Sequence, residues 1–85
     1  MPTISMFYGI LIRMHKHEHN PPHFHAKYGE FEASFDFDGE ITEGQFPPKQ
    51  TALVKSWALI HTDELNANWE LLGTDEQLYR IPPLQ

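Results

Sequence analysis

Five of the six histidines of this 85-residue chain lie between positions 15 and 25, so this segment holds most of the side chains that could do chemistry. Neutral imidazole is the commonest transition-metal ligand, and its unperturbed pKa lies near neutral pH. His23 and His25 alternate along a segment with strand periodicity, which puts both rings on one face. His19 precedes them in a loop, and the hairpin expected below places Asp36 opposite His23.

Two or three imidazoles with a carboxylate form an ordinary ligand set for zinc, nickel or non-haem iron. We therefore expect His19, His23, His25 and Asp36 to be the candidate ligands of a divalent transition metal, zinc or nickel. The same residues could instead supply a general acid or base, which would be His23 oriented by Asp36. The alternative is a solvated strand face that binds such metals adventitiously. The chain has no H-E-x-x-H motif, no nucleophile elbow and no phosphate-binding glycine loop, so we assign no catalytic residue.

The net charge argues against a nucleic-acid partner. The chain carries 12 acidic residues and 6 Lys and Arg, which gives −6 with neutral histidines, and protonation of all six histidines would bring it to zero. Binding to a phosphate backbone needs a surplus of Lys and Arg. Such binding would require a local basic patch of Arg13, Lys16 and Lys27 with protonated histidines. Clustered histidines also suggest a pH-responsive surface, because their charges repel one another.

The chain has no cysteine, which excludes a disulfide framework, a thiolate metal site and a cysteine nucleophile. Its longest apolar run, Met6 to Ile12, is far short of the ~20 residues that a membrane helix needs. The first residues lack the basic segment and cleavage site of a secretion signal. We therefore expect a cytoplasmic protein without a membrane anchor.

Residues 23–28 and 31–37 alternate between apolar and polar side chains, as strands with one buried face do. A two-residue turn at 29–30 would join them in an antiparallel hairpin. On the polar face this register pairs His23 with Asp36, His25 with Ser34 and Lys27 with Glu32. On the apolar face it pairs Phe24 with Phe35, Ala26 with Ala33 and Tyr28 with Phe31.

Residues 4–14 have apolar side chains on both alternating faces, so we expect them to form one central or well-covered strand. An Asp-Gly pair after the second strand of the hairpin is typical of another tight turn. It predicts a three-residue loop at 38–40 and a short strand at 41–46, with Phe37 opposite Ile41.

Apolar residues recur at helical spacing over about 49–72. Thr62, followed by two acidic residues, is typical of an N-cap and a new first turn, so a kink or break is expected near 61–62. The tail, 74–85, is too short for more than a brief extended segment. We expect a single domain of residues 1–85 with an α+β fold, in which an antiparallel three- to four-stranded sheet carries one long kinked helix or two consecutive helices on one face.

The opening MPTIS and the segment Asn-Pro-Pro-His-Phe-His-Ala at 20–26 resemble the small bacterial proteins grouped as domain of unknown function 4160. The resemblance covers essentially the whole chain, and 20–26 is its most specific part. It implies that His19, His23 and His25 belong to the family signature, whereas His15 and His17 look variable. Members have no established activity. They resemble one half of small two-gene modules that are candidate toxin–antitoxin systems.

We therefore expect a non-enzymatic protein-interaction module. The resemblance suggests that it is one component of such a pair, with a small partner encoded by a neighbouring gene. The interaction residues would be Asn20, Pro21, Pro22, Phe24 and Lys27. The alternative is a metal-dependent hydrolase or nuclease-like toxin that uses the histidine cluster. The acidic residues of the hairpin region are either a solvated face or a patch for a basic partner.

Overall fold

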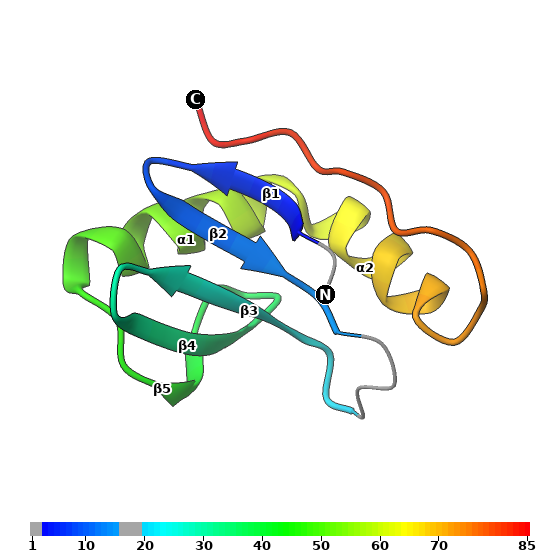
Figure 1. Cartoon of the computed structure of the whole chain (residues 1–85), viewed down its shortest axis with the longest axis horizontal. Coiled ribbons are helices and arrows are strands. Elements are labelled where there is room, and N and C mark those ends of the chain that lie inside the picture. The colour runs from blue at the N-terminus through cyan, green and yellow to red at the C-terminus, as the bar shows by residue number, and fades with distance from the viewer. Residues whose placement is uncertain (1–2, 16–19) are drawn as a thin grey trace.

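The computed structural model describes residues 3–15 and 20–85. The chain has an α+β fold in which a five-stranded antiparallel sheet, ordered β1-β2-β3-β4-β5, precedes two helices that pack along one of its faces (Figure 1). The strands are β1 Thr3–Phe7, β2 Ile10–Arg13, β3 His23–Tyr28, β4 Phe31–Asp36 and β5 Ile41–Gly44. The helices are α1 Pro48–Ile60 and α2 Thr62–Leu71.

The expected three- to four-stranded sheet is wrong because residues 4–14 form two strands. Tyr8 and Gly9 make a two-residue turn between β1 and β2, with φ of 48° and 79°. Positive φ at both central residues is the geometry of a type I′ hairpin turn. Such a turn reverses the phase of the alternation, so Phe7 before it and Ile10 after it face the same side. That reversal explains why the sequence looks apolar on both faces of one long strand.

The hairpin of β3 and β4 has the predicted register. All six predicted pairs are confirmed, from His23 opposite Asp36 at one end to Tyr28 opposite Phe31 at the other. The turn between them contains Gly29, with φ of 58°. Because the register is correct, His25 and Ser34 lie side by side on the face away from the helices.

The next hairpin departs from the prediction. Phe35, not Phe37, lies opposite Ile41, and the register shifts between Ser34 and Phe35. An irregularity of this kind adds a residue to one strand and cannot be read from alternation alone. At Gly44, with φ of 89°, a Cβ atom would collide with the backbone of β4, so this close pairing requires glycine.

The loop after β4 is held by side chains at both of its ends. Asp36 Oδ1 accepts hydrogen bonds from the backbone N–H of Asp38 and of Glu40, both at 3.0 Å. Lys55 Nζ of α1 donates to Glu40 Oε1 at 2.8 Å. This hydrogen bond, with the negative charge of Glu40, raises the pKa of Lys55. The loop therefore rests on α1, with Gly39 against the Lys55 side chain.

The core lies between the sheet and the helices and is centred on Trp57 of α1. Trp57 is fully buried, and its ring contacts Phe7 of β1 and Phe24 of β3 at centroid distances of 5.4 and 5.6 Å. Its Nε1 donates to the carbonyl oxygen of Pro82 at 2.9 Å. One side chain thus joins the first helix, two strands and the C-terminal tail.

The helical region breaks where the sequence predicts. The backbone N–H of His61 still bonds to Trp57 O at 3.0 Å, and a new helix begins at Thr62. His61 rather than Thr62 is the N-cap, and the Thr62 hydroxyl donates back to Ala58 O at 2.9 Å. Neither helix is long and apolar enough to cross a membrane, nor is any other helix in the described part of the chain.

The C-terminal tail returns across the molecule to the β1 edge of the sheet (Figure 1). Fully buried Asn68 of α2 holds the tail through both ends of its amide: Nδ2 donates to Tyr79 O at 2.9 Å, and Oδ1 accepts from Tyr79 N at 2.8 Å. Further along, Ile81 N donates to Ile4 O at 2.7 Å. The tail therefore covers part of the β1 edge.

Replacing Asn68 by alanine should detach this tail. The substitution removes two hydrogen bonds and leaves a buried gap, so we expect the free energy of unfolding to fall by about 2 kcal/mol. Urea denaturation followed by tryptophan fluorescence measures this. Asn66→Ala on the same helix is the matched control, because Asn66 is exposed and should change stability by less than about 0.5 kcal/mol. Equal losses in the two variants would contradict the proposed role of Asn68.

Candidate functional site

The face of the sheet opposite the helices carries a group of polar and charged side chains. Residues that alternate with the core positions point to this side, and no helix of the described chain covers them. We call this surface the helix-free face, and define it by Leu11 and Arg13 of β2, His25 and Lys27 of β3, Glu32 and Ser34 of β4, and Glu43 of β5.

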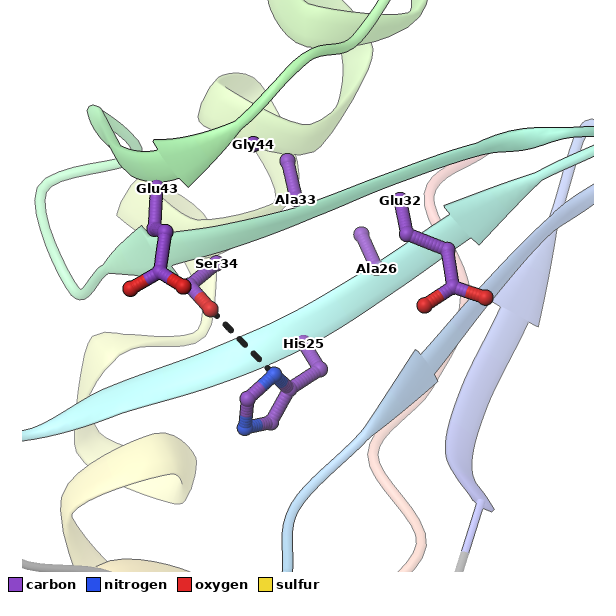
Figure 2. Close-up of a pocket in the computed structure, with 7 residues that line it drawn as sticks. All are labelled: His25, Ala26, Glu32, Ala33, Ser34, Glu43 and Gly44. Carbon is purple, nitrogen blue, oxygen red and sulfur yellow. Dashed lines mark hydrogen bonds between the residues drawn. The ribbon is translucent and has the colours of Figure 1, made fainter.

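His25 lies at the centre of the helix-free face. Three adjoining hollows share it: one over β3–β5 with Ser34 and Glu43, one toward Asn20 and His23, and one toward β2. Figure 2 shows the first, where the His25 ring and the Ser34 hydroxyl lie side by side. His25 Nδ1 and Ser34 Oγ are 3.3 Å apart. The hollows are partly open to solvent rather than enclosed, so they suit contact with a surface better than enclosure of a small substrate.

Three histidine rings adjoin around His25. The rings of His15 and His25 meet edge to face at a centroid distance of 4.2 Å, and those of His23 and His25 at 5.2 Å. His23 also contacts Trp69 of α2 at 5.5 Å. The structure thus brings together the predicted His23 and His25, and adds His15, which the sequence reasoning gave less weight.

A correct pairing of β2 with β3 would have identified His15. Arg13 lies opposite His25 in an antiparallel pair. Continuing this register by two residues would bring His15 toward His23. The sequence conceals this signal because residues 4–14 have the pattern of one strand, in which a separate pairing of β2 with β3 is not apparent. His19 and His17 lie outside the described residues.

The tautomer of His23 follows from its neighbour. His23 Nδ1 lies 2.8 Å from the carbonyl oxygen of Pro21. A carbonyl oxygen only accepts hydrogen bonds, so Nδ1 must carry the proton, and the neutral ring then has its acceptor at Nε2. Pro21 follows a cis peptide bond and, with Asn20, lines the second hollow.

The predicted interaction residues separate into two groups. Asn20, Pro21 and Lys27 are exposed at the hollows, and Pro22 is half-buried. Phe24 is fully buried and stacks on Phe35 at a centroid distance of 5.6 Å. Its side chain belongs to the core, because it alternates with His23 and His25 and so faces the helices.

Asp36 lies opposite His23 as predicted, but one of its carboxylate oxygens already accepts two backbone hydrogen bonds in the loop after β4. The geometry therefore gives Asp36 a role in holding that loop. Among residues 3–15 and 20–85, no three His, Asp or Glu side chains are arranged to hold a metal ion. The predicted ligand His19 lies outside this range.

Charge is unevenly distributed over the helix-free face. Arg13 and Lys27 lie on β2 and β3, whereas Glu32 and Glu43 lie on β4 and β5. Lys27 Nζ is 3.5 Å from Glu32 Oε1, where the two halves meet. The face is therefore basic on one side and acidic on the other, although the whole chain has a charge of −6.

The fold and this face define a small α+β protein with helices on one side of a sheet and a polar, open surface on the other. The chain belongs to the DUF4160 family, described as a domain of unknown function, whose sequence profile matches residues 9–70. No curated protein and no solved structure matches the chain. The matched residues run from the β1–β2 turn to the last part of α2 and include the helix-free face.

The assignment of the His23 proton can be tested by nitrogen NMR. At a pH where His23 is neutral, the ¹⁵N shifts of its ring should identify the Nδ1–H tautomer, because Pro21 O accepts that hydrogen. Ser34→Ala removes the hydroxyl beside His25 and should leave the His23 signals unchanged. A neutral His23 with its hydrogen on Nε2 would contradict this geometry.

Proposed function

We propose that this protein is a cytoplasmic, non-enzymatic interaction module that binds a protein partner on its helix-free face. The observation that carries the proposal is that three adjoining open hollows share His25 across four strands of this face. A broad surface of adjoining, partly open hollows fits a second protein, whereas small-molecule sites bury most of their ligand.

The composition of the face supports a protein partner. Met6 of β1 is 56% exposed and lies opposite Leu11, so apolar contact area adjoins the charged residues. Methionine and arginine are enriched in protein interfaces, and a flexible methionine adapts to different partners. His25 and Ser34 add hydrogen-bonding groups at the centre.

The arrangement around Ser34 favours binding over catalysis. Its hydroxyl lies 3.3 Å from His25 Nδ1, slightly beyond the distance at which a base usually activates a nucleophile. Ser34 lies within a regular strand, and its cross-strand neighbour Glu43 places negative charge beside it. A carboxylate there would oppose the anion that forms when a serine attacks a carbonyl group.

The family resemblance suggests where the partner is encoded. Proteins similar to this one resemble one half of two-gene modules, so the first candidate partner is the product of a neighbouring gene, in a toxin–antitoxin-like pair. The surface chemistry of the helix-free face applies equally to either member of such a pair.

Reversing one charge on the helix-free face should weaken the complex. Lys27→Glu places a carboxylate beside Glu32, and we expect at least a tenfold loss of affinity for the neighbouring gene product. Co-purification and then calorimetry measure this. Lys49→Glu is the matched control, because Lys49 is also exposed but lies on α1. No complex with any neighbouring product at micromolar concentration, or equal losses in both variants, would contradict the proposal.

A metal-dependent hydrolase or nuclease-like toxin is the second candidate, and the adjoining rings of His15, His23 and His25 favour it. The predicted ligands are His19, His23, His25 and Asp36, with zinc or nickel as the ion. A bound zinc or nickel ion would supply a water activated near neutral pH.

Metal analysis separates the two candidates. If the second is correct, tag-free protein dialysed against zinc or nickel should retain one ion per chain, and His23→Ala should lose it. His61→Ala is the control, because His61 lies on the helical side with its Nδ1 3.0 Å from Glu64 Oε2. Retention well below one ion per chain, unchanged by His23→Ala, would exclude the metal site. Growth arrest on expression that His23→Ala abolishes and His61→Ala retains would support the toxin.

A further inference from the structure

The hollow on the β2 side of the helix-free face is a distinct chemical site. It has a volume of about 140 Å³. We call it the Arg13 hollow. The described residues that line it are Leu11, Arg13, His15, His25, Ala26, Lys27 and Glu32. Pockets that hold whole small molecules are usually about 300–1,000 Å³, so this one has room for a single side chain or a small ion.

Arg13 lacks an acceptor at the wall of this hollow. Its Nε is buried and has no hydrogen-bond partner. Its cross-strand neighbours are Thr3 and His25, and neither supplies a carboxylate. None of the ion pairs within the described residues includes Arg13. A buried donor without a partner is costly, and the described residues supply Arg13 with no ion-paired carboxylate that would compete with a ligand.

The other charges leave the Arg13 hollow basic. Among the described residues of its lining, Glu32 is the carboxylate, and Lys27 Nζ lies 3.5 Å from Glu32 Oε1. Those two charges offset each other, so the charge of Arg13 remains. The imidazoles of His15 and His25 in the lining carry no negative charge. The hollow is therefore complementary to an anion.

We propose that the Arg13 hollow binds the carboxylate of an aspartate or glutamate in an acidic segment of a protein partner. This inference rests on the proposed function and names the chemistry of the partner. The planar guanidinium group matches a carboxylate with two parallel hydrogen bonds. Leu11 in the lining and Met6 beside it provide apolar contact for the methylene groups of the segment.

A nucleic acid fits the same surface less well. A phosphate backbone extends over many charges, and on this face it would pass Glu32 and Glu43 within a chain of net charge −6. A single carboxylate, by contrast, can bind through the local positive charge of Arg13 alone. Binding of a nucleic acid is therefore an outcome that the experiment must distinguish.

The test is an NMR titration of ¹⁵N-labelled protein with a blocked hexaglutamate peptide at low salt. We expect amide shifts concentrated at Arg13, His25 and Lys27. Hexaglutamine, inorganic phosphate and a hexathymidine oligonucleotide are the comparison probes, and we expect weaker shifts from each. Added salt should weaken the peptide binding, because the contact is between charges near the surface.

Substitutions of Arg13 separate the roles of its charge and shape. Arg13→Gln should weaken hexaglutamate binding about tenfold or more, and Arg13→Lys should restore only part of it, because lysine keeps the charge but lacks the planar pair of donors. Lys49→Gln is the control, since it removes one exposed charge from α1 and should leave the binding unchanged. Amide signals away from the hollow report whether each variant is folded.

Three results would overturn this inference: no shifts with hexaglutamate at millimolar concentration, equal binding by wild type and Arg13→Gln, or stronger binding of the oligonucleotide or phosphate. The peptide titration needs no partner, so its failure is separate from that of the proposed function. A partner complex that Lys27→Glu weakens and Arg13→Gln leaves unchanged would support the interaction module and overturn the carboxylate site.

Discussion

The packing of the two helices on a single face of the sheet is the constraint on which the rest of the structure depends. Trp57 carries much of it, because its fully buried ring contacts Phe7 and Phe24 from two strands and its Nε1 holds the returning tail at Pro82. A small sheet with one covered face leaves the other face to solvent or to a partner. The helix-free face is thus a direct result of how the core is made.

Strand alternation then divides the residues of β3 between stability and surface chemistry. Phe24 points to the helices and stacks on Phe35, while His23 and His25 on either side of it point away. The same alternation places Ile12 in the core and Arg13 on the helix-free face. A short segment therefore contributes to both the core and the surface, and only its outward residues are able to contact a partner.

The distribution of charge limits the kind of partner that this face would fit. A net charge of −6 describes the whole chain, but the β2–β3 side of the face carries Arg13 and Lys27, and the β4–β5 side carries Glu32 and Glu43. Electrostatic complementarity governs orientation and the choice of partner more than it governs total affinity. A surface with both signs of charge side by side favours a partner that docks in one orientation.

The sequence by itself determined the β3–β4 register, the helix break near His61 and the outward direction of His23 and His25, because local periodicity reports which side of an element each residue faces. It left the Tyr8–Gly9 turn undetected, since a tyrosine at positive φ carries no turn signal, and the irregular β4–β5 pairing has no local signature either. Only the tertiary structure placed His15 and Arg13 beside His25. That contact joins strands separated by a long connection, and their pairing is decided by packing against a common core.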